Sequence, residues 1–429
     1  VAVRPGGRAL ALLLAANRLG LRVAVADPTV GPDVLRARLA LADPALLVAD
    51  AAAQAVAGWA APLAGRAHLR LPDLRTIGPM LTIGPRLPGA APVLAPCATV
   101  LPPHPAGDGD AIVVFTSGTT ASPRGVVHTR ASLDAGLVAV RDLVHPAADQ
   151  AVLGGTFFVL VPSLSAGAPV ALPARTGRGV SRQLHRLRPQ ATYLTPPQLR
   201  SALGASARFT GQVYSGSAPV TASLLARVRA AGADEAWGVY ALTEFFPAAA
   251  IESADKLAFA GEGDLAGRLL PGVRAAVADD GELMLAGPAA CDRYLGGPPL
   301  ARIATGDIAR LVDDGRQVVL AGRAKDMVLR RAVNIYPGLY EPALHVEGVS
   351  LAVLVGVPAG DGDERLVAVV EPQPGADHAR VRRSLHGPLA RMGQARPDAV
   401  LLARVPLAGR SRKPDRAAAA LLAHRAQPW

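Results

Sequence analysis

Apolar and amphipathic stretches alternate along the first half of the chain. The pattern predicts an amphipathic helix within residues 1–16, a strand at 21–26, a second helix at 31–40 and a second strand at 45–50. Residues 61–109 are rich in Pro, Gly and Ala and are expected to form an irregular connection. Helical and strand segments continue to alternate to about residue 250. Since this alternation is typical of sheets with parallel strands, we predict an α/β fold here.

The pattern changes near residue 261, where short apolar runs separated by Gly and Asp begin. Asp-Asp-Gly stands between two such runs at 279–281 and again at 313–315, and this is a hairpin signal. After residue 323 a compact α/β segment follows, with expected strands at 351–358, 365–372 and 398–406. We therefore predict a large amino-terminal domain of α/β subdomains and a β-rich hairpin region (1–322), a hinge (323–326) and a small mobile α+β domain (327–429).

A loop of small residues at 116–125 lies between an expected strand at 112–115 and an expected helix at 126–140. Small residues let the backbone approach an anion, so that N–H groups and hydroxyls can hold phosphate oxygens while a nearby cation offsets the charge. The spacing differs from that of the P-loop, and such a segment alone is equally compatible with an ordinary loop. The loop residues are Thr116, Ser117, Gly118, Thr119 and Thr120, with Arg124 as the cation.

The composition indicates a large folded protein with a surplus of positive charge. Half of the residues are apolar, which allows a large core and two or more domains, and the formal net charge is +11. Arginines are scattered and aromatic residues make up 4% of the chain, so nucleic-acid binding is not expected. Among the 45 basic residues three are lysines. Lys256 is attributed to chance, whereas Lys325 and Lys413 fall in motifs described below.

Two further features bear on location. Cys97 and Cys291 are far apart, which gives neither a disulfide framework nor a metal-ligand spacing and fits a reducing compartment. No run of 18 apolar residues occurs, so we expect no integral membrane segment and a cytoplasmic protein.

With five other segments, the loop forms an ordered set that resembles the motifs of the adenylate-forming (AMP-binding) superfamily, which includes acyl-CoA synthetases, luciferases and peptide-synthetase adenylation domains. The family loop reads TSGTTGxPKG, and here Ala121 and Arg124 replace its second Gly and its Lys. The other segments are YSGSAP at 214–219, YALTE at 240–244, TGD at 305–307, GRAKDM at 322–327 followed by NIYP at 334–337, and SRKPDR at 411–416.

The resemblance implies a role for each matching residue. Thr243 would contact the α-phosphate, Glu244 would hold Mg²⁺, Lys413 would support adenylation and Lys325 would be the hinge residue. A carboxylate suits a hard cation that bridges phosphates. Asp307 would bind the ribose hydroxyls. The positions implied to bind ATP are Thr116, Ser117, Gly118, Thr119, Thr120, Arg124, Ser215, Gly216, Ser217, Ala218, Pro219, Tyr240, Ala241, Asp307 and Arg323.

The resemblance also implies an activity. A carboxylic acid, with a fatty acid as the leading candidate, would react with ATP and Mg²⁺ to give acyl-AMP and pyrophosphate, and the acyl group would then pass to CoA. A non-enzymatic binding protein with a degenerate site is the alternative of a different class, and the retained Lys413 and Glu244 argue against it. The sequence lacks a GxSxG elbow, which disfavours hydrolase chemistry.

Departures from the family pattern leave the acyl acceptor open. The family has a Gly-Gly pair before the Asn of its hinge region, which allows close backbone approach to pantetheine. Here residues 329–334 read LRRAVN, so that side chains crowd this path, although Arg330 and Arg331 could instead favour phosphates of CoA or of a carrier protein. The alternative is a CoA-independent ligase that loads a carrier protein or an amine, or that closes a β-lactone as in the olefin-pathway branch, which residues 156–167 and 240–247 loosely resemble.

Three smaller expectations complete the sequence account. The aromatic segment 156–162 lacks the His that often gates the family's acyl site; an apolar wall suits a fatty chain and equally an ordinary core. His128 and His185 have no partner spacing and are expected to be structural or on the surface. The chain is short for the family, and its start corresponds to a point inside the usual amino-terminal domain.

Overall fold

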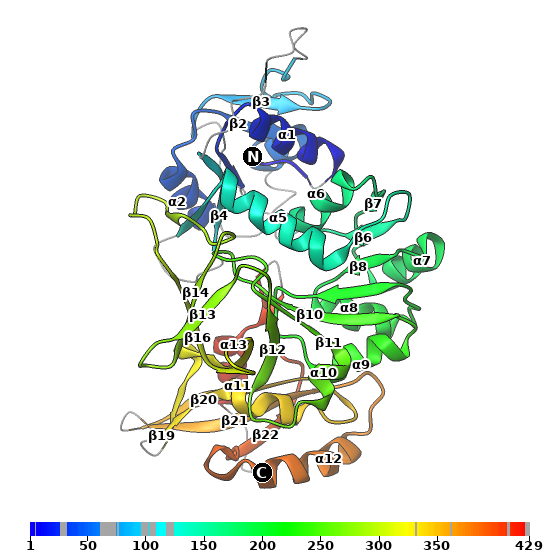
Figure 1. Cartoon of the computed structure of the whole chain (residues 1–429), viewed down its shortest axis with the longest axis vertical. Coiled ribbons are helices and arrows are strands. Elements are labelled where there is room, and N and C mark those ends of the chain that lie inside the picture. The colour runs from blue at the N-terminus through cyan, green and yellow to red at the C-terminus, as the bar shows by residue number, and fades with distance from the viewer. Residues whose placement is uncertain are drawn as a thin grey trace. The chain divides into compact units, whose positions relative to one another are not determined.

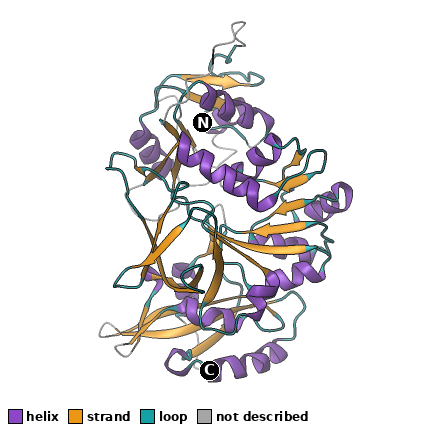
Figure 2. Ribbon diagram, in the orientation of Figure 1, coloured by secondary structure: helices purple, strands orange, loops and turns teal. Residues whose placement is uncertain are grey.

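The computed structural model describes residues 1–4, 6–25, 32–60, 74, 77–95, 102, 109–116, 124–330, 333–360, 363–409 and 412–424. The chain divides into two compact units (Figure 1). Unit 1 contains Val1–Val138, Thr243–Phe246 and Pro288–Ile303, and unit 2 contains Ala139–Leu242, Pro247–Gly287 and Ala304–Trp429. Helices and strands are mixed throughout both units (Figure 2), which confirms the predicted α/β class.

Unit 1 is built on two small sheets. One has the strand order β1-β4-β5-β15 and the other pairs β2 with β3. β1 pairs with β4 in one sheet and β2 pairs with β3 in the other, and both pairs are parallel. The first two strands of the chain therefore belong to different sheets. The elements are α1 (Gly7–Arg18), β1 (Val23–Val25), α2 (Pro32–Ala42), β2 (Leu47–Asp50), α3 (Ala51–Ala57), β3 (Met80–Ile83), β4 (Asp110–Phe115), β5 (Gly125–Thr129), the first part of α5 (Arg130–Val144), and β15 (Arg293–Tyr294).

The helix predicted at 126–140 is wrong at its start. Residues 125–129 form β5, which pairs antiparallel with β4, and Val126 and Val127 are fully buried between neighbouring strands. β-branched valines favour a strand with a paired strand on each side, and this pairing overrides the local helical pattern. α5 begins at Arg130, where the Thr129 hydroxyl accepts a hydrogen bond from the Ser132 amide in the manner of an N-cap.

The irregular connection predicted at 61–109 is also wrong in part. Within the portion that the structure describes, Met80–Ile83 form β3 beside β2. The Thr82 hydroxyl donates to Ala91 O at 2.7 Å and accepts from Gln54 Nε2 at 2.9 Å, so this strand is tied to α3 by buried polar contacts. The signal was weak because a strand of four residues offers almost no periodicity.

Unit 2 contains a sheet with the strand order β13-β14-β16-β17-β12-β11-β10-β9-β8-β6-β7. Strands β10, β9, β8, β6 and β7 are parallel, as predicted. The pairs β10–β11, β11–β12 and β12–β17 are antiparallel, and antiparallel hairpins join β13 to β14 and β16 to β17 at the two Asp-Asp-Gly turns. The strands are β6 (Val152–Gly154), β7 (Val170–Ala171), β8 (Ala191–Tyr193), β9 (Gln212–Ser215), β10 (Glu235–Tyr240), β11 (Ala249–Glu252), β12 (Asp264–Leu269), β13 (Arg274–Val277), β14 (Glu282–Ala286), β16 (Ile303–Val312) and β17 (Gln317–Arg323).

Helices pack on the parallel half of this sheet and enclose its core (Figure 1). Leu184, Leu199 and Leu225, one from each of three helices, are almost fully buried there against strand residues such as Val213. Thr176 and Thr221 cap two of these helices through their hydroxyls, which fixes where the helices begin. The helices are α6 (Phe157–Ser165), α7 (Gly177–Leu187), α8 (Pro196–Gly204), α9 (Ala222–Ala230) and α10 (Ser253–Ala258).

The last part of unit 2 has apolar clusters of its own. One gathers β20, β21 and α12, and another lies between the same strands and α13, so residues from 328 onward enclose cores without help from the larger sheet. All three predicted strands of this part are present. The domain boundary and the hinge stay predictions. The elements are η2 (Ala324–Asp326), β18 (Val328–Arg330), β19 (Val333–Ile335), α11 (Pro337–Tyr340), η3 (Glu341–Leu344), β20 (Val349–Gly360), β21 (Asp363–Pro372), α12 (His378–Arg391), η4 (Gly393–Ala395), β22 (Ala399–Leu402), β23 (Leu407–Ala408), β24 (Lys413–Pro414) and α13 (Arg416–Ala423).

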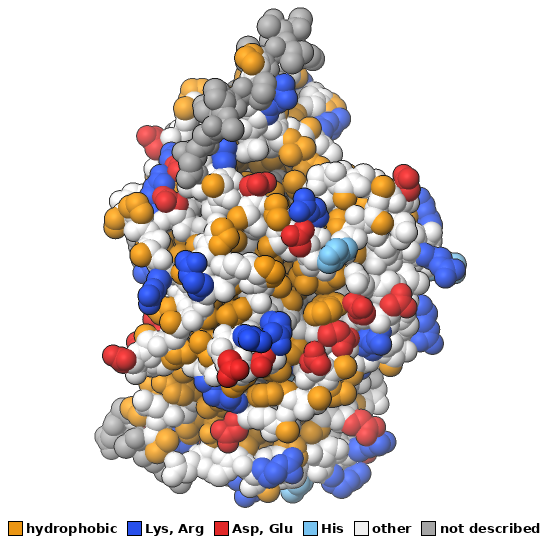
Figure 3. Space-filling model, in the orientation of Figure 1, with side chains coloured by type: hydrophobic (Ala, Val, Ile, Leu, Met, Phe, Trp, Pro, Cys, Tyr) orange, Lys and Arg blue, Asp and Glu red, His pale blue; other side chains and the backbone are white. Residues whose placement is uncertain are grey.

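Two surface properties follow from the described residues. Among them, no helix combines the length and the apolar character needed to cross a bilayer. On the face shown in Figure 3, Lys and Arg side chains are interspersed with acidic ones. The net positive charge is therefore not gathered in one patch on that face.

Candidate functional site

A buried cluster around Asp307 lies in unit 2. Asp307 and Arg323 are directly opposite each other on β16 and β17, and Arg323 Nε lies 2.7 Å from Asp307 Oδ1. The hydroxyl of Tyr240, at the end of β10, donates to the other carboxylate oxygen at 2.6 Å. The register of β16 and β17 pairs Asp307 with Arg323, and the hydrogen bond from Tyr240 adds a third residue, so that residues of three predicted motifs lie together. Since each carboxylate oxygen has two lone pairs, Asp307 keeps acceptor capacity for a hydroxyl-bearing ligand.

Electrostatics around Asp307 reflect its burial. Burial raises the pKa of Asp307, while the cations Arg323 and Lys413 and the Tyr240 hydroxyl act to lower it. Burial and the neighbouring carboxylate raise the pKa of Tyr240 well above its usual value, so Tyr240 stays a hydrogen-bond donor. The effect of Lys413 on Asp307 brings the carboxy-terminal motif into the electrostatic range of this cluster. Lys413 itself is exposed, on β24 beside β23 (Leu407–Ala408).

The loop that follows β9 has features of a ligand cradle. A side chain at Gly216 would place its Cβ 2.8 Å from Val239 O, and Ser217 has a left-handed φ of 67°. Tyr193 OH and Ser217 Oγ are 3.0 Å apart. The hydroxyl of Ser215 is buried and has no hydrogen-bond partner among the described residues. A bound nucleotide could supply that partner. Ala218 is half-buried, whereas Pro219 and, after β10, Ala241 are exposed.

In unit 1 the predicted phosphate loop joins β4 to β5. The amide of Thr116 donates to Arg124 O at 3.2 Å, which closes the base of the loop. Ser117, Gly118, Thr119 and Thr120 lie outside the described residues. Arg38 of α2 is 4% exposed and donates from Nη2 to Thr116 O at 2.7 Å, with its guanidinium carbon 5.7 Å from the Phe115 ring centroid. A buried cation therefore holds the point where the loop begins.

Thr243 and Glu244 are anchored in unit 1 by groups that the sequence did not single out as site residues. His128 Nε2 bonds to Thr243 O at 2.8 Å, and the amide of Cys291 donates to Glu244 O at 2.7 Å. Burial lowers the pKa of His128, so the ring is neutral, with Ser132 Oγ 3.3 Å from Nδ1. His128 is structural, as predicted, but its contact with Thr243 places it beside the candidate site.

Tyr294 of β15 contacts two of the predicted site residues. Its hydroxyl donates to Glu244 Oε1 at 3.2 Å, and the Arg124 guanidinium carbon is 5.5 Å from its ring centroid. Arg38 and Tyr294 were not named from the sequence, and His128 was named only as a structural or surface residue, although each contacts a predicted site residue. For Tyr294 the available signal was an aromatic residue close to the Gly-Gly pair at 296–297, but its contacts join positions far apart in sequence.

The residues around Lys325 and Arg330 are engaged in ion pairs. Lys325 is exposed in η2, and the next residue, Asp326, lies 3.1 Å from Arg416 Nε. Arg330 pairs with Asp398 and donates to Gln394 O and Arg396 O, with 11% of its side chain exposed. The suggestion that Arg330 offers its charge to CoA phosphates is therefore not supported by this geometry. Residue 331 lies outside the described residues.

Lys256, whose presence was attributed to chance, is buried and makes specific contacts. Its ammonium lies 2.6 Å from Asp264 Oδ1, donates to Leu265 O at 2.8 Å and has a side chain that is 6% exposed. It therefore joins α10 to β12 as a buried structural ion pair.

The residues that would hold ATP and Mg²⁺ fit these groups. The described residues contain no cluster of three or more His, Cys, Asp or Glu side chains, so they form no all-protein metal cage. Mg²⁺ commonly uses one or two carboxylates and completes its shell with water and phosphate oxygens, and Glu244 can serve as such a carboxylate. The orphaned Ser215 hydroxyl and the close approach at Gly216 fit a nucleotide.

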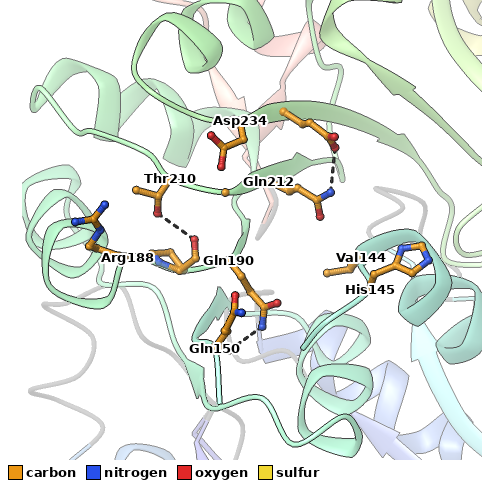
Figure 4. A pocket seen from close by; sticks show the side chains of 11 residues that line it. Val144, His145, Gln150, Arg188, Gln190, Thr210, Gln212 and Asp234 are labelled. Carbon is orange, nitrogen blue, oxygen red and sulfur yellow. Dashed lines mark hydrogen bonds between the residues drawn. The ribbon is translucent and has the colours of Figure 1, made fainter. Parts of the chain in front are cut away.

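A polar cavity of about 540 Å³ in unit 2 lies elsewhere (Figure 4). Its residues stand where β8, β9 and β10 begin, whereas Ser215 and Tyr240 stand where β9 and β10 end. Ligands of parallel sheets bind at the carboxyl ends of strands. Several of its polar groups bond to each other, as Gln212 Nε2 does to Glu235 Oε2 at 3.0 Å and Thr210 to Pro189 O at 3.0 Å. This cavity is thus distinct from the candidate nucleotide site.

Comparison with known proteins gives the fold and the family of this chain. The amide bond synthetase McbA from Marinactinospora thermotolerans shares the fold, with a TM-score of 0.77 at 24% identity over 98% of this chain and 88% of that chain. The family model described as AMP-binding enzyme matches residues 1–295. The chain belongs to the AMP-binding enzyme family.

Two curated relatives illustrate the range of this family. An indoleacetate–CoA ligase of Aromatoleum aromaticum is 28% identical over 319 residues, which cover 65% of this chain and 61% of that protein. The fatty acid–[acyl-carrier-protein] ligase ScoC of Streptomyces coeruleorubidus is 31% identical over 310 residues, covering 61% of this chain and 57% of that protein. The matches thus span less than two thirds of either relative.

Proposed function

We propose that this protein activates a carboxylic acid with ATP to form an acyl-AMP and pyrophosphate. Family membership supports this chemistry. The observation that carries it is the cluster of Tyr240, Asp307 and Arg323, in which the positive charge of Lys413 acts to lower the pKa of Asp307. Four separate motifs contribute to this arrangement, which matches the ribose-binding and adenylation roles implied by the family resemblance.

In the proposed reaction an oxygen of the acid's carboxylate attacks the α-phosphorus of ATP. The bond from that phosphorus to the oxygen bridging the β-phosphate breaks, and pyrophosphate leaves with the electron pair. Both reactants are anions, so catalysis consists mainly of positioning and charge neutralisation. Lys413 would lie between the carboxylate and the α-phosphate, Thr243 would contact the α-phosphate, and Arg124 with Thr116–Thr120 would hold the leaving group.

The nucleotide would be held by the remaining predicted residues. Asp307 would accept hydrogen bonds from ribose hydroxyls, with Arg323 beside it, and residues Ser215–Pro219, Tyr240 and Ala241 would line the adenine. Mg²⁺, when bound through Glu244, would neutralise phosphate charge. The carboxy-terminal residues from 327 would rotate about Lys325 after the first step, a motion that lets one site serve two half-reactions.

The acid is proposed to be a fatty acid and the first acceptor CoA. The name of the relative ScoC includes a fatty acid as its substrate, and the name of the indoleacetate–CoA ligase includes CoA as its acceptor. Because indoleacetate is an arylacetic acid, the assay of acid substrates below includes it.

A CoA-independent ligase is the second candidate, and the hairpin of β18 and β19 favours it. Leu329 and Asn334 pair across this hairpin, and the Leu329 amide donates to Glu364 Oε2 at 2.8 Å. Residues 329–334 read LRRAVN, so the sequence has side chains in place of the glycine pair with which the family admits pantetheine. The acceptor would then be a carrier protein or an amine, or the acid's own β-hydroxyl in β-lactone formation.

The test is pyrophosphate release from ATP and Mg²⁺ with a panel of acids. The panel spans short to long chains, with and without a β-hydroxyl, and includes indoleacetate, each with and without CoA. We expect release with at least one acid and its loss in Lys413→Ala, with products identified by mass spectrometry. Release that CoA stimulates, with a thioester product, supports the first acceptor, and CoA-independent turnover supports the second candidate. Equal release by Lys413→Ala and the parent would refute the role of Lys413, and no release with any acid would refute the proposed activity.

A further inference from the structure

Tyr294 lies between two side chains of opposite charge. Its ring faces the guanidinium of Arg124, at 5.5 Å from the ring centroid, and its hydroxyl donates to Glu244 Oε1 at 3.2 Å. A cation over an aromatic face and a donor on a carboxylate are both favourable contacts. One neutral side chain therefore makes a favourable contact with each charged group while lying between them.

The backbone around Tyr294 fixes this position. Tyr294 is opposite Val126 in the pairing of β15 with β5, and the Leu295 amide donates to Gly125 O at 2.7 Å. On its other side, Arg293 makes two bonds to the Asp110 carboxylate, at 3.0 and 2.7 Å. Tyr294 is thus attached to the strand that directly follows the predicted phosphate loop.

The bond between Tyr294 and Glu244 occupies only part of the carboxylate. A single hydroxyl can donate one hydrogen bond, here to Glu244 Oε1 at 3.2 Å. The remaining lone pairs of Glu244 are left for other partners.

Without such a spacer, Arg124 and Glu244 would be drawn together. An Arg–carboxylate pair is commonly bidentate and occupies both carboxylate oxygens and one edge of the guanidinium. Such a pair would take the cation from phosphate oxygens and the carboxylate from a divalent ion.

We propose that Tyr294 is a positioning residue that keeps Arg124 and Glu244 apart, so that the guanidinium serves the phosphates of ATP and the carboxylate serves the divalent cation. This role rests on the proposed function. It gives Tyr294 no direct contact with the reacting atoms. Two changes separate its parts, because Tyr294→Phe removes the donor and keeps the ring, and Tyr294→Leu removes both.

The first experiment is calorimetric binding of ATP to the whole chain with and without Mg²⁺. We expect Tyr294→Phe to lower the Mg²⁺-dependent gain in ATP affinity by about 10-fold, as for partners that orient metal ligands, and to leave metal-free binding almost unchanged. Tyr340→Phe is the matched control, since Tyr340 is half-buried against the carboxy-terminal core and outside the proposed site.

The second experiment tests the spacer itself. Tyr294→Leu is expected to weaken metal-free ATP binding as well, because Arg124 can then pair with Glu244. In a Glu244→Gln background the same Leu substitution is expected to have little further effect on metal-free binding, since the competing charge is gone.

The outcomes separate this inference from the proposed function. If the parent protein binds ATP with a Mg²⁺-dependent gain that Tyr294→Phe retains in full, the role of Tyr294 is wrong and the proposed function stands. If Tyr294→Leu weakens metal-free binding equally in both backgrounds, the spacer role is wrong. If the parent does not bind ATP, the proposed function fails and this role fails with it.

Discussion

Asp307 carries its charge in a place where burial opposes ionisation. Arg323 and Tyr240 offset that cost with one short contact to each carboxylate oxygen. A carboxylate kept in this way is pre-oriented, because both of its oxygens already have fixed directions. Its remaining lone pairs could accept hydrogen bonds from a diol, which is the residue-scale basis of the proposed ribose contact.

Removal of this carboxylate is expected to weaken ATP binding. Asp307→Ala should raise the Kd for ATP by roughly 10- to 100-fold, in line with about 1.5–3 kcal/mol for hydrogen bonds to a charged group. Asp313→Ala is the matched control, since Asp313 lies in the turn of the β16–β17 hairpin and pairs with Arg268 of β12, and these side chains are 40% and 58% exposed. Calorimetry that finds equal Kd values for the two variants would contradict the ribose role.

His128 provides a second prediction at the residue scale, and it concerns stability against pH. Burial lowers the pKa of His128 below its ordinary value of 6.5. As pH falls below 6.5, His128 is protonated in the unfolded chain but stays neutral in the folded chain. The stability contributed by the neutral ring is therefore complete above pH 6.5 and declines as pH falls toward the lowered folded-state pKa.

His128→Gln is accordingly expected to lower the melting temperature more at pH 7.5 than at pH 5.5. The loss at the higher pH corresponds to about 1–2 kcal/mol, for a buried hydrogen bond and its packing on Phe246. Scanning calorimetry measures both values, with the exposed His185→Gln as control. A shift of the same size at both pH values would show that His128 does not titrate as described.

At the scale of elements, Arg416 joins α13 to the segment that follows Lys325. Its guanidinium bonds to Glu341 at 2.6 and 2.9 Å, to Leu354 O at 2.7 Å and to Asp326 at 3.1 Å. Burial alone would lower the pKa of Arg416, but the carboxylates of Glu341 and Asp326 raise it above its usual value. The charge is thus permanent and fully compensated.

Loss of this cation would leave two carboxylates facing each other. Arg416→Leu is expected to destabilise the carboxy-terminal part by about 3–5 kcal/mol, as when one partner of a buried pair is removed. Arg380→Leu breaks an exposed pair with Glu347, whose side chains are 64% and 77% exposed, and should be nearly neutral. Urea unfolding monitored by hydrogen exchange in β20 and α13 compares the two, and equal protection would refute this account.

At the scale of the whole molecule, the sequence predicted elements whose pattern is local. The Asp-Asp-Gly hairpins and the carboxy-terminal strands are present because turn residues and apolar runs are adjacent in sequence. β5 was predicted as a helix because its pairing with β15 joins residues far apart in the chain. For the same reason the site contacts of Arg38, His128 and Tyr294 could not be predicted, since each residue contacts its partner only through tertiary packing.

The sequence motifs identified candidate site residues that lie together, but they gave no information on the packing around these residues. Asp307, Arg323 and Tyr240 come from three motifs and lie together, because register places Asp307 opposite Arg323 and the Tyr240 hydroxyl donates to Asp307. The role of Lys256 was misjudged, since its ion pair with Asp264 has no sequence signature. The proposed functions of these residues stay predictions until binding and turnover are measured.

The central claim is that the acid's own oxygen attacks the α-phosphorus of ATP. It is tested most directly with an acid that turns over in the pyrophosphate assay and is labelled with oxygen-18 in its carboxylate. Mass spectrometry after turnover should find one labelled oxygen in AMP and none in pyrophosphate, because the acceptor displaces AMP together with that oxygen. Label in ADP or inorganic phosphate, or unlabelled AMP, would contradict the formation of an acyl-AMP.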